Sequence, residues 1–523
     1  MVLTISNLLV KLLGMLFKIP MNYIVGDTGM GYYNAAYTIY TFFYMLSTAG
    51  LPAAVAIMVS AARSERKWAK SRLVLRAALL LFCLIGTFGT AILFLFPDAL
   101  AALTGAPPAS VSILAVAPTL FFVCIASALK GYFQGCSRMT PTAVSQLLEA
   151  LCKVGAGILG AVYAVHQGYP PHIIAAYAVL GLTLGTGISM LYLIAAWFRS
   201  HETISDLPSV PEKREYRPVF RQLAAIAVPV TVSSAVMSLT GLIDAVLIQR
   251  LLQHTGMTQE AATTVYGNYT SLAVPMFNMP PALVYPIAYA IVPLLTKYHA
   301  AGESGMADKQ RKTASALRMA SIIGTPCAMG MTVLAKPILS LLYRESSAET
   351  AAPLLTLLAP SSLLVCVLAI TNAVLQSIGK AKLPVYSMLA GAAVKILTTI
   401  LLIPVMGIRA APISTFLCYL TVTAWNLFFL LRHMEMQLRM SSTFFLPLLA
   451  AGCCSACACL TYQLMASHLS EKIAVLTAIV LAAVVYFLMI RVLHILQPED
   501  LELLPKNQKL RKWLHIQETE KSK

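Results

Sequence analysis

Charged residues are scarce in this chain. Asp, Glu, Lys and Arg together make up 11% of its 523 residues, whereas apolar residues make up 58%. A soluble globular domain carries about 25% charged residues, so the composition excludes that class. Apolar runs of about 20 residues, the length that crosses a bilayer core, follow one another along the whole chain. We therefore expect an all-α polytopic membrane protein without a soluble domain.

The periodic apolar runs predict fourteen membrane spans. Their approximate ranges are 2–24, 34–60, 77–101, 110–134, 142–165, 173–197, 222–250, 266–294, 319–343, 352–378, 384–405, 411–431, 443–466 and 473–493. The first span lacks the basic leader and the small-residue cleavage site of a signal peptide, so we expect it to remain as a helix.

Acidic residues are scarcer than basic ones, 21 against 38, which gives a net charge of +17. With the fourteen spans in place, 29 Lys and Arg residues lie in or beside the connections on one side and four on the other. The positive-inside rule puts the basic side and both termini in the cytoplasm, in a multi-pass protein of the cell membrane. The charge thus reflects topology and contact with anionic headgroups, and nucleic acid is not an expected partner.

Motifs that carry chemistry are also lacking. The chain has no Walker loop, no zinc-ligand pair on one helix face and no nucleophile elbow. Eleven cysteines occur, several of them in "CCSACAC" at 453–459, but Ala and Gly surround these and no His or carboxylate does. They are typical of small residues that pack between helices. We expect no enzyme, no metal and no cofactor; the membrane potential or an ion gradient is a possible energy source.

A parallel repeat divides the predicted spans. "FQGCSRMTPTAVSQLLEALCKVGAGIL" (133–159) aligns without a gap with "LQSIGKAKLPVYSMLAGAAVKILTTIL" (375–401) at an offset of 242, which places Lys153 opposite Lys395. The longest connection is polar and rich in proline, as a linker between lobes would be. The predicted parts are an N-lobe with helices 1–6 at 1–198, a cytoplasmic linker at 199–221, a C-lobe with helices 7–12 at 222–432, helices 13 and 14 at 433–495, and a cytoplasmic tail at 496–523.

Helix 1 carries a polar seam. At 100° per residue, the positions that fall within an arc of about 80° are Asn7, Lys11, Gly14, Lys18 and Asn22. A lysine at membrane depth costs roughly 2.5 to 3.5 kcal/mol, so the seam is expected to line a wet cavity that takes an anionic group. Lys18 lies nearer the span end, and snorkelling to the interface is the alternative for it.

Further polar residues lie inside other predicted spans. Glu149 precedes Lys153 by one turn on helix 5, which fits either simple neutralisation or a coupled polar site. Asp244 on helix 7 is a candidate salt-bridge partner for Lys395 on helix 11. Asn268 and Asn372 belong to the polar or coupling residues of the C-lobe, although interhelical hydrogen bonding is the commoner role. Prolines expected to kink helices are Pro20, Pro52, Pro280 and Pro281.

Several motifs resemble a known family. "KLLGMLFKIP", "GMGYYNAAY", "STAGLPAAVA", "LKGYFQGCSRMTPTAVSQLLE", "SLTGLIDAVLIQRLL" and "YGNYTSLAVPMFNMPPAL" are similar to segments of the oligosaccharide flippases in the multidrug, oligosaccharidyl-lipid and polysaccharide exporter superfamily. The likeness is strongest to the branch of the stage V sporulation protein B and the lipid II flippases of Gram-positive bacteria, and it extends to about residue 495.

The resemblance implies a flippase that moves an undecaprenyl-pyrophosphate-linked oligosaccharide to the outer leaflet by alternating access. It implies that cations of the N-lobe line the central cavity, and Lys11 and Lys18 match these in kind. Its cargo would be a lipid-linked precursor of peptidoglycan, spore cortex or another polysaccharide, with membrane lipid and cell-wall or spore-cortex synthesis proteins as partners. Related flippases can hold a cation in the C-lobe, where this chain has Lys395, so sodium coupling is in doubt.

Three other functions remain open. A drug or cation antiporter of the same superfamily would need carboxylates to meet cationic substrates. A non-transporting scaffold of envelope or spore-coat assembly would have no use for lysines on a buried seam. An integral-membrane glycosyltransferase would need acidic catalytic residues in a large loop, which the sequence lacks.

Overall fold

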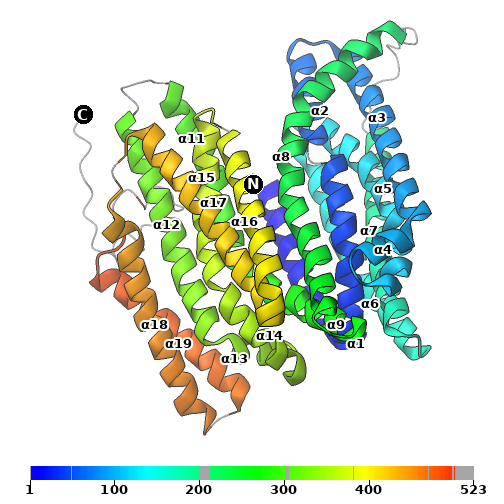
Figure 1. Cartoon of the computed structure of the whole chain (residues 1–523). Coiled ribbons are helices and arrows are strands. Elements are labelled where there is room, and N and C mark those ends of the chain that lie inside the picture. Colours follow the sequence, from blue (N-terminus) through cyan, green and yellow to red (C-terminus); the bar gives the residue numbers. More distant parts are fainter. Residues whose placement is uncertain are drawn as a thin grey trace. The chain divides into compact units, whose positions relative to one another are not determined.

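The computed structural model describes residues 2–48, 50–199, 213–300, 306–380, 382–436, 438–468, 470–497 and 500. Every regular element within these ranges is a helix, as the composition predicts. The chain forms two compact units, Met1–Ser271 and Leu272–Lys523 (Figure 1). The predicted linker at 199–221 lies mostly outside the described residues, and most of the tail at 496–523 does as well, so these lobe boundaries stay a prediction.

Unit 1 is built around its first helix. In chain order its helices are α1 (Val2–Thr48), α2 (Leu51–Ser64), α3 (Trp68–Leu95), α4 (Pro97–Leu103), η1 (Pro107–Ala109), α5 (Ser110–Gly135), α6 (Met139–His166), α7 (Pro171–Arg199), α8 (Lys213–His254) and α9 (Gln259–Asn268). Buried side chains of α1, among them Phe17, Tyr33 and Ile39, form one core with α5 and α7. The same α1 also packs against α6, α8 and α9.

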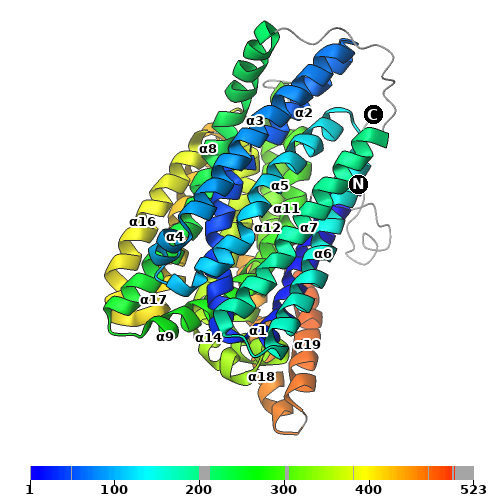
Figure 2. The ribbon, with the colours of Figure 1, turned by 90° about the vertical axis from the view of Figure 1, so that its right-hand side faces the viewer.

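A π-helical turn at Tyr269–Ala273 leads into unit 2. Its helices are α10 (Val274–Phe277), α11 (Met279–Ala300), α12 (Met306–Val333), α13 (Ala335–Leu342), α14 (Glu345–Leu358), α15 (Pro360–Ser377), α16 (Lys382–Met406), η4 (Gly407–Arg409), α17 (Ala410–Met434), η5 (Ser441–Phe445), α18 (Leu446–Ala466) and α19 (Glu471–Val492). The last two helices pack together, and α18 packs on α12, so they form an added pair at the edge of this unit (Figures 1 and 2).

Ten described helices are long and apolar enough to cross a membrane, or eleven when the bent pair of α12 and α13 counts as one span. Two of the ten are double-length runs, Phe17–Ser64 and Lys382–Met434, of 48 and 53 residues. At 1.5 Å per residue each would extend over about 70 to 80 Å, more than twice the roughly 30 Å core of a bilayer. Lys382–Met434 therefore has room for the predicted spans 384–405 and 411–431, and Phe17–Ser64 contains the predicted span 34–60 with the end of the span before it. The exact count of fourteen stays a prediction.

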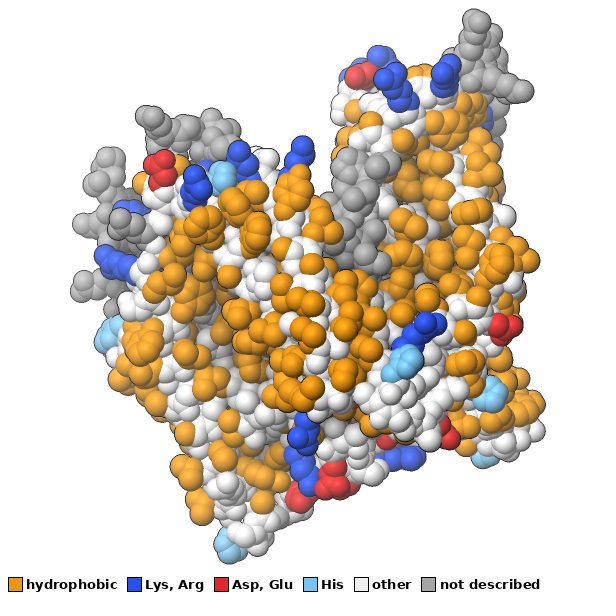
Figure 3. All heavy atoms as spheres, viewed as in Figure 1, with side chains coloured by type: hydrophobic (Ala, Val, Ile, Leu, Met, Phe, Trp, Pro, Cys, Tyr) orange, Lys and Arg blue, Asp and Glu red, His pale blue; other side chains and the backbone are white. Residues whose placement is uncertain are grey.

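Apolar side chains cover the flanks of the helices, and charged ones gather near their ends. In Figure 3, hydrophobic atoms cover the middle of unit 2, whereas Lys and Arg side chains lie at its ends. Large apolar residues such as Phe88, Leu159 and Val405 are more than 70% exposed. Such a surface is stable in lipid rather than in water, and it agrees with a multi-pass membrane protein.

The local structure repeats at the offset of 242. Ser137 and Gly379, which correspond, both have positive φ angles, 58° and 76°. In the turns that they occupy, Arg138 N donates to Phe133 O at 2.9 Å, and Lys380 N donates to Leu375 O at 2.9 Å. This helix-ending geometry satisfies carbonyls that the helix leaves unpaired. On the following helices, Ser145 Oγ and Ser387 Oγ each donate to the carbonyl three residues before. The internal repeat therefore extends from residue types to backbone conformation.

Three of the four prolines expected to kink helices lie at helix starts. The break inside α1 is at Gly26, with φ 75° and ψ 170°, whereas Pro20 lies within helix. Pro52 lies in the first turn of α2, and Pro280 and Pro281 in the first turn of α11. A proline fits there because the first helical N–H groups have no partner within the helix. Pro52, Pro280 and Pro281 therefore mark helix starts, and the residue with positive φ at the break inside α1 is a glycine.

Candidate functional site

Two lysines come together inside unit 1. The Lys18 ammonium on α1 donates to the carbonyl oxygen of Thr270 at 3.0 Å, so this half-buried side chain has a protein acceptor. Lys153 on α6 lies close enough for the charges of the two ammonium groups to interact. Like charges repel in a poorly hydrated interior, so holding two ammonium groups near each other favours an anion between them.

Aromatic rings surround Lys153. Its ammonium lies 4.9 Å from the centre of the Tyr37 ring and 5.8 Å from that of Phe17. The Tyr37 ring belongs to a ladder on α1, in which it stacks on Tyr33 with centroids 5.9 Å apart and contacts Tyr40 at 6.1 Å. Cation–π contacts hold an ammonium without neutralising it, so the charge stays available to a ligand. Tyr33 and Tyr37 belong to the motif "GMGYYNAAY", but the residues predicted for the site do not include this ladder.

Glu149 has a different partner from the one expected. Its Oε2 lies 3.3 Å from the ammonium of Lys130, which α5 supplies, and both side chains are largely buried. The predicted partner, Lys153, is one turn further along α6 and forms no ion pair within the described part of the chain. Lys130 falls near the end of the predicted span 110–134, and the structure places it on α5. Glu149 thus forms its ion pair with Lys130, and its charge still acts on Lys153 from one turn away.

A polar network joins α1 to α9. Asn22, fully buried, donates through Nδ2 to Asp27 Oδ1 at 3.1 Å, and Asn268 Nδ2 donates to Asp27 Oδ2 at 3.2 Å. Asn268 thus has the interhelical hydrogen-bonding role that is commoner for an amide in a membrane helix. Asp27 was missed because it falls between the first two predicted spans, just after the break at Gly26.

Glycines allow α1 and α9 to cross closely. A Cβ added to Gly267 would lie 2.6 Å from the Asp27 carbonyl oxygen and 2.7 Å from the Gly31 nitrogen. Beside this crossing, the hydroxyls of Thr28 and Thr264 are 2.8 Å apart. Asn34 donates to Ser271 Oγ and to the Met30 carbonyl. Backbone approach and side-chain hydrogen bonds therefore stabilise one helix pair together.

The predicted residues of helices 7, 10 and 11 belong to different units. Asp244 lies on α8 in unit 1, and Lys395 lies on α16 in unit 2, where its side chain is 7% exposed. Their salt bridge stays a prediction. Asn372 on α15 accepts a hydrogen bond from Asn426 Nδ2 at 2.7 Å, and Asn426 in turn accepts from Ser387 Oγ at 2.6 Å. This chain of contacts joins α15, α16 and α17 inside unit 2.

The structure says less about three other polar residues of the predicted spans, Asn7, Lys11 and Lys336. Asn7 and Lys11 lie on α1, but their side chains are outside the described residues. Lys336, which the predicted spans placed inside the membrane, lies on α13 after a bend of 84°. There it is 52% exposed and pairs with Glu345 and Glu349 at 3.3 and 2.8 Å. Among the described residues, no group of three or more His, Cys, Asp or Glu side chains is arranged to hold a metal ion.

Comparisons with known proteins agree with this architecture. Lipid II flippase MurJ of Bacillus subtilis is 25% identical over 448 residues, which cover 83% of this chain and 82% of that protein. Stage V sporulation protein B of the same organism is 23% identical over 517 residues, covering 97% and 96%. A solved structure of lipid II flippase MurJ in an inward closed conformation matches the fold, with a TM-score of 0.69 at 14% identity over 94% of this chain and 98% of that one.

Two family models match the sequence. The model described as MatE matches residues 229–401. The model described as polysaccharide biosynthesis protein matches residues 1–299, which is more than half of the chain. The chain therefore belongs to the polysaccharide biosynthesis protein family, and it resembles the flippase branch of the multidrug, oligosaccharidyl-lipid and polysaccharide exporter superfamily, including stage V sporulation protein B.

Proposed function

We propose that this protein is a flippase for lipid-linked oligosaccharides, and that it moves an undecaprenyl-pyrophosphate-linked sugar from the inner to the outer leaflet by alternating access. The cargo would be lipid II or a related precursor of spore cortex or polysaccharide. Two relatives carry names that point this way, lipid II flippase and stage V sporulation protein B. The protein would act in the cell membrane with both termini in the cytoplasm, beside enzymes that make or use the same glycan.

The observation that carries the proposal is the pair of lysines in unit 1. The Lys18 ammonium donates to the Thr270 carbonyl oxygen and the Lys153 ammonium lies over the Tyr37 ring, while Glu149, the acidic group on α6, forms its ion pair with Lys130. A pyrophosphate brings two or more negative charges into a poorly hydrated site, and ammonium groups provide charge-assisted hydrogen bonds to it. Lys11, seven residues before Lys18 on the same seam, is proposed as a third cation.

The same arrangement argues against a cation antiporter. A cationic drug would need a carboxylate to face it, and beside Lys153 the carboxylate of Glu149 is instead paired with Lys130. A scaffold without transport would gain nothing from two ammonium groups held near each other. The pair therefore favours an anionic cargo over both alternatives.

The direct test is complementation. A strain that depends on one lipid II flippase would receive the wild-type chain, the Lys11→Ala/Lys18→Ala double variant or a Lys336→Ala control. We expect the control, which removes an exposed lysine, to support growth. The double variant should reach the membrane at the same level but fail to complement, because the pyrophosphate loses its charge partners. Full complementation by the double variant would overturn the proposal. Identifying the lipid-linked intermediate that accumulates in a deletion strain would establish the cargo.

A further inference from the structure

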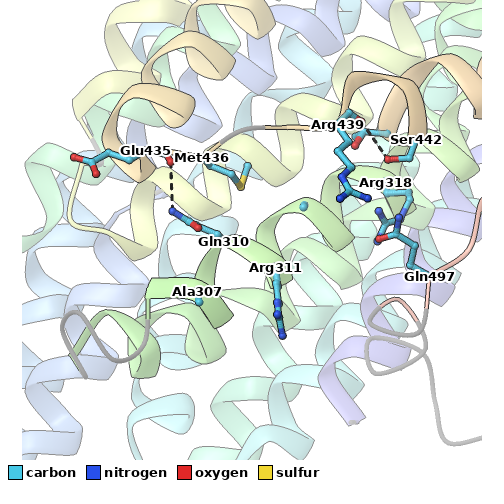
Figure 4. A pocket seen from close by; sticks show the side chains of 11 residues that line it. Ala307, Gln310, Arg311, Arg318, Glu435, Met436, Arg439, Ser442 and Gln497 are labelled. Carbon is cyan, nitrogen blue, oxygen red and sulfur yellow. Dashed lines mark hydrogen bonds between the residues drawn. The ribbon is translucent and has the colours of Figure 1, made fainter. Parts of the chain in front are cut away.

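Unit 2 contains a basic cavity that the proposed transport does not use. Its volume is about 560 Å³, and it lies between the first turns of α12, the connection from α17 to α18, and the segment after α19 (Figure 4). Three arginines line it, Arg311, Arg318 and Arg439, together with Gln310 and Gln497. In Figure 4, Arg439, Arg318 and Gln497 gather at one end of the cavity, and Glu435 lies towards the other end. A cavity of this size matches a small polar ligand.

One of the arginines is already neutralised. Arg318, with 5% of its side chain exposed, donates through Nε and Nη2 to the two oxygens of Asp500, both at 2.7 Å. The backbone N–H of Gln497 donates to the same carboxylate at 2.9 Å. This ion pair fixes the segment after α19 as a wall of the cavity. It leaves Arg311 and Arg439, both exposed, as the cations that can bind a ligand.

The surroundings of the cavity place it at the membrane boundary. One apolar run ends at Met434, and the next begins at Ser441, so the lining residues between them connect two spans. Beside the cavity, Met440 and Phe445 are 51% and 61% exposed. Met440 follows Arg439 in the sequence, and Phe445 lies two residues after the lining residue Thr443. Exposed apolar residues in the same segment as the lining residues suit a molecule with a phosphate and acyl chains, whereas a soluble anion would use only the arginines.

We propose that this cavity binds the phosphodiester headgroup of an anionic membrane lipid, with Arg311 and Arg439 on the phosphate and Met440 and Phe445 against the acyl chains. The arginine-rich side is the one that the basic-residue count assigns to the cytoplasm, where anionic headgroups are attracted to basic pockets between helices. A guanidinium can donate two parallel hydrogen bonds to a phosphate, so arginine gives more specificity than lysine here. The bound lipid would be a structural ligand of unit 2 rather than the transported cargo.

The test uses the purified full-length protein in detergent. Thermal unfolding is followed while short-chain phosphatidylglycerol, the matching phosphatidylcholine or inorganic phosphate is added. We expect phosphatidylglycerol to raise the midpoint for the wild-type chain and the other two additives to leave it unchanged. In Arg311→Gln/Arg439→Gln, the phosphatidylglycerol concentration that gives half of the increase in midpoint should rise at least about tenfold, because two charge-assisted contacts are lost. For Arg311→Lys/Arg439→Lys, this concentration should lie between those of the wild-type chain and the Gln variant.

A matched control removes two basic side chains elsewhere. Lys70→Gln/Arg76→Gln changes two exposed residues of α3 in unit 1, so it tests general attraction of an anionic lipid to a basic protein. We expect the control to respond as the wild-type chain does. An equal response of the Gln variant and the control would overturn the site. Equal stabilisation by inorganic phosphate would overturn its assignment to a lipid. If Arg311→Gln/Arg439→Gln does not fold, the test uses Arg311→Lys/Arg439→Lys instead. A response of that variant to phosphatidylglycerol equal to the wild-type response would contradict the proposal that two guanidinium groups bind the phosphate.

Discussion

At the scale of single residues, burial decides how much an ion pair contributes to stability. Arg318 and Asp500 are almost fully buried and form two short hydrogen bonds, whereas Lys336 and its acidic partners are more than half exposed. Burying the Arg318–Asp500 pair costs desolvation energy, which only well-aligned hydrogen bonds can offset. Water screens the exposed pairs of Lys336, so they contribute little. Lys153 differs from both because it lies on aromatic rings instead of a carboxylate.

Arg318→Ala should destabilise unit 2 strongly. It leaves the Asp500 carboxylate buried without its cation, and removing one partner of such a pair costs about 3 to 5 kcal/mol. Lys336→Ala breaks an exposed pair, which is worth about 0 to 1 kcal/mol. Thermal unfolding of both purified variants checks the difference. A midpoint loss in Arg318→Ala no larger than in Lys336→Ala would show that the buried pair contributes little.

At the scale of helices, the sequence predicts where the helices lie better than it predicts which side chains pair between them. Hydropathy finds the spans, and the repeat at an offset of 242 correctly indicates matching turns before α6 and α16. The Arg318–Asp500 pair could not be predicted, because it joins residues 182 positions apart and no local periodicity reports such a contact. Lys130 was missed for a similar reason, since a lysine near a predicted span end gives no sign that the neighbouring helix carries Glu149.

The crossing of α1 and α9 depends on the absence of a side chain at Gly267. Gly267→Ala places a methyl group within 2.6 Å of the Asp27 carbonyl oxygen, so one helix must shift, at a cost of about 1 to 3 kcal/mol. Gly155→Ala is the control, because nothing lies within 4 Å of the added Cβ and alanine favours helix. The expected result is a lower unfolding midpoint for Gly267→Ala alone. Equal midpoints would mean that the crossing adapts without cost.

At the scale of the whole molecule, the two units share a repeat but differ in polar content. Unit 1 combines its lysine pair with a tyrosine ladder, while unit 2 buries Lys309 and Lys312 on α12 and Lys395 on α16, and contains the amide chain through Asn426. We infer that unit 1 recognises the anionic part of the cargo. The sequence predicts Lys18 and Lys153 as site residues from the cost of buried charge, but not the rings that hold Lys153.

The membrane potential is expected to drive outward movement of an anionic cargo. With the cell interior negative, each net negative charge moved outward gains roughly 2.3 kcal/mol per 100 mV. Flipping in proteoliposomes should therefore slow when ionophores clamp the potential at zero. The same vesicles with the potential restored provide the control. An unchanged rate at zero potential would remove the potential as the energy source.

The central claim is that Lys18 and Lys153 bind the pyrophosphate of the cargo. The most direct measurement is the rate at which purified protein in proteoliposomes flips an undecaprenyl-pyrophosphate-linked sugar. The comparison is between the wild-type chain, Lys18→Ala/Lys153→Ala and Lys336→Ala at equal protein content. We predict that the double variant loses at least about tenfold in rate, corresponding to about 1.4 kcal/mol or more, and that Lys336→Ala flips at the wild-type rate. A double variant that flips as fast as the wild-type protein would contradict the account.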